Sequence, residues 1–344
     1  FAQRLNVLRV RLASSLSAAL LTTFLNILSY SGVSMFARFL NVRKDRIAIM
    51  AAVLLTSIFP VNMLTSAPPE PRGIDGQFSG KQGEIVVVRV PADRQITVVT
   101  GRFLNRKIPF FPDRSGEAPP SYVGLVGVDL QDPPGTHELV LDIVSDAGHR
   151  RLSYNLLVVK EKRAVQRLTL PKDKVDLDED SLIRVKAEQA QVRTALETVS
   201  ERRLWASDFL RPVEGPITGA FGRQRIINGQ AKNPHNGEDI AAPFGADVVA
   251  MNDGVVCLTA DHFFSGKGVF IDHGLGLYSM YFHLSEVSVK DGAAVKKGQV
   301  IGKVGASGRA TGPHLHWGVN MNGARVDPLS LTKLSFDHST PAVQ

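Results

Sequence analysis

The chain has 344 residues and one cysteine, which allows two modest domains but excludes a framework of internal disulfides. Its formal charge of +7 comes almost entirely from residues 1–46, which carry seven Lys and Arg residues against one Asp. The rest of the chain is close to neutral, so the basic charge does not indicate a nucleic-acid surface, and we expect no nucleic-acid partner.

Residues 1–67 have the pattern of a secretory signal behind an upstream extension. A basic flank precedes the uncharged apolar run 47–64, and small residues follow it up to Ala67, where we expect cleavage. Met35 would start this signal, which leaves residues 1–34 as the extension. The alternative is an uncleaved membrane anchor at 47–64, because that run is about long enough to span a thinned bilayer. Both alternatives place the remainder in the periplasm or cell envelope.

Residues 74–160 contain short apolar segments separated by turn signals such as 132–136 and 146–148. This spacing predicts a small β-sandwich domain. The segment holds no cluster of catalytic residue types. His137 and His149 stand alone in it, and we expect both at the surface.

Residues 161–211 form a linker in which one amphipathic helix is predicted over 181–200. Apolar side chains recur there at helical spacing from Leu182 to Val199, and acidic residues precede the first turn. We expect this helix to pack on a neighbouring domain, with partner binding as the alternative.

From residue 212 the chain becomes glycine-rich, with several short strand patterns and no long helix up to residue 330. This composition and strand pattern predict a compact domain of curled antiparallel sheet, followed by a tail at 331–344. Cys257 lies in an apolar run, so it is expected to be a structural thiol. The predicted fold class is therefore mainly β: a C-terminal curled antiparallel β-sheet domain, preceded by a small β-sandwich and one linking helix.

Two histidines stand close together in the predicted strand that follows Pro313. Because residues i and i+2 of a strand face the same way, His314 and His316 should project together, opposite Leu315 and Trp317. A hydrogen-bonded pair on a surface strand is one interpretation. A metal site is the other, since imidazole is the commonest metal ligand.

Other metal-binding residue types occur earlier in the same domain. His235 and Asp239 flank Gly237, which would let the backbone turn so that both side chains converge. His283 lies within a predicted strand. One carboxylate and several imidazoles suit zinc, and three protein ligands with one open position are typical of a catalytic site.

Three motifs follow one another in this domain: H-N-G-E-D, Y-F-H-L and H-L-H. The flanking segments include G-A-F-G-R, D-I-A-A-P and G-R-A-T-G-P. Together they resemble the lysostaphin and LytM type of zinc endopeptidase over residues 212–330. Residues 74–160 resemble the sandwich-like domain that precedes some secreted members. The resemblance implies a small antiparallel sheet and cleavage of peptide cross-links in bacterial cell walls.

The resemblance also implies a role for each motif residue. His235, Asp239 and His316 would bind one zinc ion per chain, while His283 and His314 would be catalytic histidines that are not ligands. Two neutral imidazoles and one carboxylate leave a net charge of +1, which would lower the pKa of a bound water to roughly 7. One free histidine would move the proton and the other would stabilise the oxyanion.

The function expected from this resemblance is zinc-dependent hydrolysis of peptide bonds in peptidoglycan stem peptides or cross-links. The alternative is a non-enzymatic, wall-binding regulator of other cell-wall hydrolases. In the enzyme, the sandwich domain would either shield the substrate groove or position the protein on the wall.

A few further residues carry expectations of their own. Glu238 stands where the family more often has an apolar residue, and we expect a solvated side chain, or else an acceptor for a ligand imidazole. Arg225 and Asn228 would line the groove or hold a loop. The remaining histidines are expected as follows: His262 and His338 at the surface, and His273 in a turn.

Overall fold

The computed structural model describes residues 77–91, 96–113, 120–169, 177–197, 200–205 and 207–335. All of them belong to one compact unit, Ala67–Gln344. The predicted signal or anchor, His338 and most of the predicted tail lie outside the described residues. Among the helices that the structure does describe, none combines the length and the apolar character needed to cross a bilayer.

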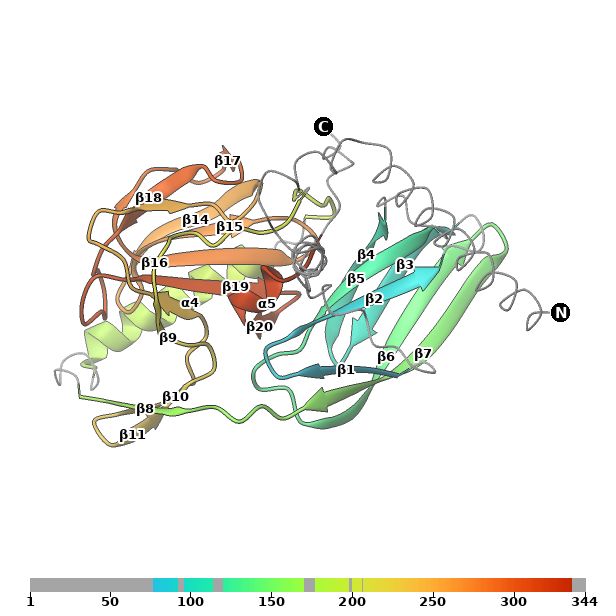
Figure 1. Ribbon diagram of the computed structural model, residues 1–344, viewed down its shortest axis with the longest axis horizontal. Coiled ribbons are helices and arrows are strands. Elements are labelled where there is room, and N and C mark those ends of the chain that lie inside the picture. Colours follow the sequence, from blue (N-terminus) through green and yellow to red (C-terminus); the bar gives the residue numbers. More distant parts are fainter. Residues whose placement is uncertain are drawn as a thin grey trace, which may run out of the picture. The chain divides into compact units, whose positions relative to one another are not determined.

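Seven strands form the first sheet of the chain: β1 (Gln77–Lys81), β2 (Ile85–Pro91), β3 (Ile96–Phe103), β4 (Arg106–Asp113), β5 (Ser121–Gly127), β6 (Gly135–Ser145) and β7 (Gly148–Val159). Their order is β1-β7-β6-β3-β4-β5-β2 (Figure 1). The first half of β4 pairs with β3 and its second half pairs with β5, so one strand belongs to two pairing groups. Side chains of both groups share one apolar core that includes Val88, Phe103 and Leu139.

The connecting segment contributes a strand and a helix: β8 (Val165–Leu168) and α4 (Glu179–Glu197). The Asp178 carboxylate accepts a hydrogen bond from the Ser181 amide at 2.8 Å, which satisfies a free donor of the first turn. Only Val185 of this helix is buried, and Leu182 is 45% exposed, so its apolar face is narrower than the spacing predicted.

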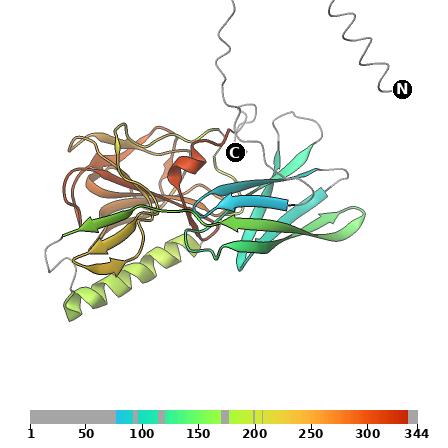
Figure 2. The same cartoon turned by 60° about the horizontal axis from the view of Figure 1, so that its bottom comes forward.

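The helix α4 lies along the C-terminal domain (Figure 2), and polar contacts hold it there. The Arg184 guanidinium donates to the Asp261 carbonyl at 3.0 Å, and the Glu188 carboxylate accepts from the Phe263 amide at 3.0 Å. Gln191 contacts the ring of His262 at 3.1 Å. The expectation of a surface position for His262 is wrong, because α4 and its neighbours bury that side chain.

The C-terminal domain consists of twelve short or medium strands and one short helix: β9 (Ile217–Gly219), β10 (Gln224–Ile227), β11 (Gln230–Lys232), β12 (Glu238–Ile240), β13 (Asp247–Val249), β14 (Gly254–His262), β15 (Gly266–Asp272), β16 (Leu277–Val287), β17 (Ala294–Val295), β18 (Val300–Val304), β19 (Leu315–Met321), β20 (Ala324–Val326) and α5 (Pro328–Leu331). The main sheet has the order β17-β14-β15-β16-β19-β12-β9 (Figure 1). All pairs within it are antiparallel, and β13, β18 and β20 join it at the sides.

A smaller sheet in the order β11-β10-β8 stands beside the main one. β10 and β11 form a hairpin whose turn residues, Asn228 and Gly229, have φ angles of +51° and +79°. This pair is typical of a tight hairpin turn, since Asn and Gly tolerate the left-handed region. β8 pairs in parallel with β10, so the connecting segment adds a strand to the C-terminal domain.

The predicted fold class is confirmed: the chain is mainly β, with a curled antiparallel sheet after a sandwich and one linking helix. The main sheet buries Tyr281, Leu315 and Trp317 completely. Cys257 is half-buried, and burial raises the pKa of its thiol to about 12, so it remains protonated at neutral pH. The domain boundaries themselves stay predictions.

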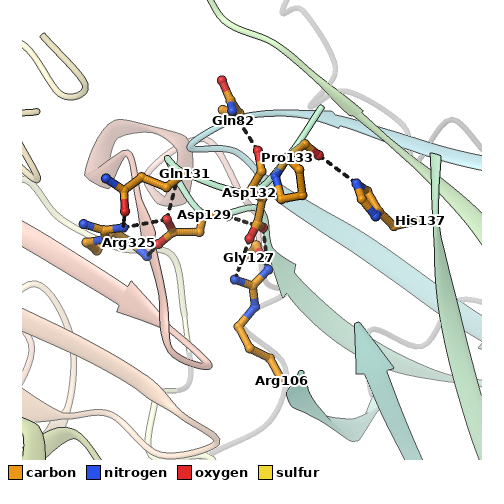
Figure 3. A network of polar contacts seen from close by, with 9 residues as sticks. All are labelled: Gln82, Arg106, Gly127, Asp129, Gln131, Asp132, Pro133, His137 and Arg325. Atoms are coloured by element: carbon orange, nitrogen blue, oxygen red, sulfur yellow. Dashed lines mark hydrogen bonds and ion pairs between the residues drawn. The ribbon is translucent and has the colours of Figure 1, made fainter. Parts of the chain in front are cut away.

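An ion pair joins the sandwich to the C-terminal domain (Figure 3). Arg325, in β20, donates from Nη2 to Asp129 Oδ1 at 2.7 Å and from Nε to Oδ2 at 3.1 Å. The Arg325 amide donates to the same carboxylate at 2.7 Å. Asp129 is 6% exposed, so this carboxylate depends on Arg325 for its compensating charge.

Arg325→Ala should lower the free energy of unfolding by about 1–3 kcal/mol, because it leaves a buried carboxylate without its charged donor. Urea denaturation at neutral pH measures the change. Arg151→Ala is the matched control, since Arg151 makes a similar two-point contact to Asp142 on the exposed face of the sandwich. Exposed pairs of this kind contribute little, and we expect hardly any change. Equal losses in both variants would contradict a special contribution from Arg325.

The effect of Arg325→Ala should also depend on pH. Burial raises the pKa of Asp129, but the hydrogen bonds and charge of Arg325 outweigh it and hold the pKa below its ordinary value. The stabilisation is therefore complete above the unfolded pKa of about 3.9 and is lost as the pH falls through the lower folded pKa. The difference between wild type and variant should narrow in that acidic range, and a difference that widens there would exclude this origin.

Candidate metal centre

Three side-chain atoms of the C-terminal domain converge on one point. Asp239 Oδ1 lies 2.9 Å from His235 Nε2 and 2.8 Å from His316 Nδ1, and the two nitrogens are 2.9 Å apart. Within the described residues, this triad is the group of His, Cys, Asp and Glu side chains that could hold a metal ion. Three potential ligand atoms at such spacing form one face of a coordination site.

Strand pairing brings two of these residues together. β12 and β19 are antiparallel neighbours, and their register sets Asp239 directly opposite His316. Opposed residues on one face of such a pair have Cβ atoms about 4.5–5.5 Å apart, which is within reach for a carboxylate and an imidazole. His235 enters from the loop between β11 and β12. Gly237 permits the close fit, because a Cβ there would lie 2.6 Å from His316 Nε2. The glycine is needed here for space, since its backbone is not left-handed.

The triad fits a divalent transition metal ion. Two ligands bound at 2.0–2.1 Å around a tetrahedral ion are separated by about 3.3 Å, close to the observed spacing. The Nδ1–H of His235 donates to the Ala220 carbonyl at 3.2 Å, so Nε2 of that ring directs its lone pair into the triad. An imidazole anchored in this way is oriented as a ligand.

The charge state of the triad also suits a metal ligand set. Burial raises the pKa of Asp239, but the imidazoles of His235 and His316 outweigh it and hold the pKa below its ordinary value. Burial lowers the pKa of His316 to about 4. At neutral pH the carboxylate is therefore anionic and the His316 ring neutral, which are the forms that bind metal.

The two remaining histidines of the motifs stand beside the triad. His314 Nε2 lies 3.9 Å from Asp239 Oδ1, and the ring centroids of His314 and His283 are 4.7 Å apart. Each ring donates its Nδ1–H to a main-chain carbonyl at 2.8 Å, of Ser307 for His283 and of Gly312 for His314. Both rings therefore have Nε2 available for substrate or solvent. All five residues singled out by the sequence lie in one place.

A β-bulge in β16 aims His283. The register of β15 and β16 shifts by one residue there, since Lys267 pairs with Leu284 but Val269 pairs with Tyr281. His283 itself has a left-handed φ of +62°, which is rare for a residue with a side chain. Burial, followed by the neighbouring imidazoles, lowers its pKa to about 3, so the ring is neutral at neutral pH.

One arginine contacts the other oxygen of the Asp239 carboxylate, and a second arginine lies in the loop after β18. Arg225 Nη2 donates to Asp239 Oδ2 at 3.2 Å, so Arg225 contacts a triad residue directly. Arg309 lies two residues after Ser307, whose carbonyl anchors His283, and the Arg309 guanidinium lies over the Phe264 ring at 4.2 Å. Burial lowers the pKa of Arg309, and the charge of Arg225 adds to this effect. Asn228 forms the hairpin turn and so holds a loop.

The sequence did not indicate several residues and main-chain groups that contribute to the site. Glu238 is 3% exposed and accepts a hydrogen bond from the Phe221 amide at 2.9 Å, so the expectation of a solvated side chain is wrong. The alternative, a direct acceptor for an imidazole, is also not what the structure shows. Arg309 stands in the G-R-A-T-G-P segment, where its basic charge close to H-L-H was the available signal. The anchoring carbonyls leave no signal, because every residue has one.

His273 is fully buried and takes part in a polar chain within the core. Its ring contacts the Asp253 carbonyl and the Ser279 hydroxyl, both at 2.7 Å. Burial lowers its pKa to about 4, so it is neutral at neutral pH. It links the turn at Asp253 to β16 and takes no part in the triad.

Comparison with protein families shows that the model of "Peptidase family M23" fits residues 233–328. A crystal structure of a protein from Pseudomonas aeruginosa assigned to peptidase M23 is similar, with 31% sequence identity and a TM-score of 0.56. The alignment covers 73% of this chain and 94% of that one.

Two curated relatives match part of the chain. One is the peptidoglycan DD-endopeptidase ShyA of Vibrio cholerae, which is 45% identical over 28% of this chain. The other is the DD-carboxypeptidase/endopeptidase Mpg of Neisseria meningitidis, which is 44% identical over 28% of this chain. The aligned part spans 22% of the length of each relative.

The triad should bind one divalent transition metal ion per chain, and Asp239→Ala should remove that binding, because two neutral imidazoles cannot replace the lost charge and ligand atom. Titration with Co²⁺, followed by its visible absorption, measures the stoichiometry. Asp142→Ala removes a carboxylate of the sandwich as a control and should bind as wild type does. Stoichiometric Co²⁺ in folded Asp239→Ala protein would exclude the triad as the site.

Proposed function

This chain belongs to peptidase family M23, and on that basis we propose that it is a zinc-dependent endopeptidase acting on peptidoglycan stem peptides or cross-links. The observation that carries the proposal is the convergence of His235, Asp239 and His316, with His283 and His314 beside them. The relative named as a peptidoglycan DD-endopeptidase supports the substrate class.

Zinc is the metal that the donor set favours. Two imidazole nitrogens and one carboxylate oxygen are typical of catalytic zinc, and three protein ligands leave a position for water or substrate. When bound, zinc activates water at neutral pH and polarises the carbonyl of the substrate. The carboxylate oxygen that faces away from the triad is held by Arg225, which fixes the orientation of Asp239.

His283 and His314 divide the proton transfer and the stabilisation of charge. One neutral ring takes a proton at Nε2 from the attacking water and passes it to the leaving amine, while the other donates to the developing oxyanion when its Nε2 also carries a proton, since both Nδ1–H groups are held by main-chain carbonyls. The lowered pKa of His283 keeps this ring neutral at neutral pH, so its Nε2 has a free lone pair. The carbonyls of Ser307 and Gly312 hold both rings in place, so neither has to reorient during the reaction.

The proposal requires a location outside the cytoplasm, since peptidoglycan lies there. The signal or anchor pattern of residues 1–67 would provide the export, and the periplasm or cell envelope is the location that follows. The chain would act there on wall peptides, with the sandwich domain N-terminal to the catalytic domain.

Arg225 and Arg309 favour an acidic peptide as the substrate, because Arg225 contacts Asp239 of the triad and its positive charge also acts on Arg309. Arg309→Ala should raise KM for a peptide with a free carboxylate more than for the same peptide as its amide. Steady-state kinetics on the matched pair of peptides measures the ratio. Lys290→Ala, which removes an exposed charge, should leave the ratio unchanged. An equal effect of Arg309→Ala on both peptides would argue against carboxylate recognition.

Purified protein should release cleaved peptides from peptidoglycan, and a chelator should stop the release until zinc is restored. His314→Ala should lower the rate by about 10²–10⁴-fold, because a group that moves a proton in the transition state is lost. Mass spectrometry of the released peptides measures both effects. His149→Ala, on the exposed face of the sandwich, should retain the wild-type rate.

Two outcomes would contradict the proposal. Undiminished turnover in His314→Ala would remove this histidine from the mechanism. Binding to peptidoglycan without cleavage, with zinc present, would instead support the wall-binding regulator.

A further inference from the structure

One peptide unit connects the buried Glu238 carboxylate to a ligand of the candidate metal centre. The Phe221 N–H donates to Glu238 Oε1 at 2.9 Å, and the Ala220 carbonyl accepts from His235 Nδ1 at 3.2 Å. The carbonyl of residue 220 and the amide of residue 221 are the two ends of a single peptide bond. A carboxylate, a peptide and an imidazole thus lie in one hydrogen-bonded series that ends at the triad.

We propose that Glu238 is a positioning residue for the metal centre, which orients and polarises His235 through the Ala220–Phe221 peptide. The inference rests on the metal site of the proposed function, but not on hydrolysis. It assigns a role to a side chain that faces away from the triad.

The proposed effect has a simple physical basis. The peptide is planar and rigid, so a hydrogen bond that fixes its N–H also fixes the direction of its carbonyl. Hydrogen bonds in series polarise one another, and a carbonyl whose amide donates to a carboxyl oxygen becomes a stronger acceptor. A stronger acceptor on Nδ1–H raises the basicity of Nε2, as a carboxylate does when it contacts a metal-binding histidine directly.

The surrounding backbone couples the same turn to His235. The Gly222 amide donates to the His235 carbonyl at 2.7 Å, and the His235 amide donates to the Arg223 carbonyl at 2.9 Å. Gly222 has a φ of +76°, a conformation that glycine adopts without strain. These hydrogen bonds hold the turn and His235 together, and Glu238 fixes the turn at Phe221.

The position of Glu238 explains how it can serve this purpose. It precedes Asp239 in β12, and neighbouring residues of a strand face opposite ways, so one short strand supplies a ligand on one face and a support on the other. Glu238 lies opposite Trp317 in the register and is 3% exposed. Its Oε2 is buried and has no hydrogen-bond partner among the described residues. An apolar side chain would fill this place at a lower desolvation cost, and the contact with the Phe221 amide is the hydrogen bond that offsets the cost for Glu238.

Glu238→Leu should weaken metal binding by about 10–100-fold, the usual effect of removing a group that supports a metal-binding histidine. Glu238→Gln should stay within about threefold of wild type, because the amide oxygen still accepts from Phe221. The affinity for Zn²⁺ and Co²⁺, measured in competition with a chelator, gives both values without an activity assay.

Asp272→Leu is the matched control. Asp272 is also a buried carboxylate that accepts a main-chain N–H, from Gly274 at 2.7 Å. The carbonyl of that same peptide bond, of His273, accepts from the Leu204 amide and not from a triad residue. This variant should lose stability and keep the metal affinity of wild type. Wild-type affinity in Glu238→Leu, or an equal loss of affinity in Asp272→Leu, would overturn the proposal.

A second measurement uses the wild-type protein and does not depend on how well a variant folds. Zn²⁺ on Nε2 makes the Nδ1–H of His235 a stronger donor, so loading should move the Phe221 amide proton resonance downfield. The Gly274 amide, which donates to Asp272, should hardly move. An unchanged Phe221 resonance in a protein that binds Zn²⁺ would overturn the proposal, whereas a protein that binds Zn²⁺ but cleaves nothing would refute only the proposed function.

Discussion

The pairing of β12 with β19 is the constraint on which the candidate metal centre depends. It sets Asp239 opposite His316, while β16 on the other side of β19 sets Phe282 opposite the same histidine and brings His283 next to it. A shift of one residue in this register would turn Asp239 away from the triad and Glu238 towards it. The chemistry of the site is therefore fixed by main-chain hydrogen bonds, and the fully buried Leu315 and Trp317 hold that register.

Main-chain carbonyls are the second common element of the site. Those of Ala220, Ser307 and Gly312 accept from the Nδ1–H of three different imidazoles. Each carbonyl belongs to a loop or turn outside the strands, and its hydrogen bond orients the ring in the absence of a ligand. Preorganisation of this kind avoids the cost of reorienting dipoles during a reaction.

The same β-hairpin serves both the site and the contact with the sandwich. β19 carries His316 near its start, and β20, which pairs with the far end of β19, carries Arg325. Arg325 holds Asp129 of the sandwich (Figure 3). The sandwich therefore contacts the C-terminal domain through an element that also forms the metal centre.

The sequence by itself determined the mainly β fold class, the linking helix and the five residues of the motifs, because strand periodicity and the spacing of His and Asp are local properties. Only the tertiary structure decided that α4 buries His262, that a bulge in β16 aims His283, and that Glu238 is buried behind the triad. Each of these depends on which strands pair and which surfaces pack together. Burial of a side chain depends on residues that are distant in sequence, and local patterns in a single sequence do not identify them.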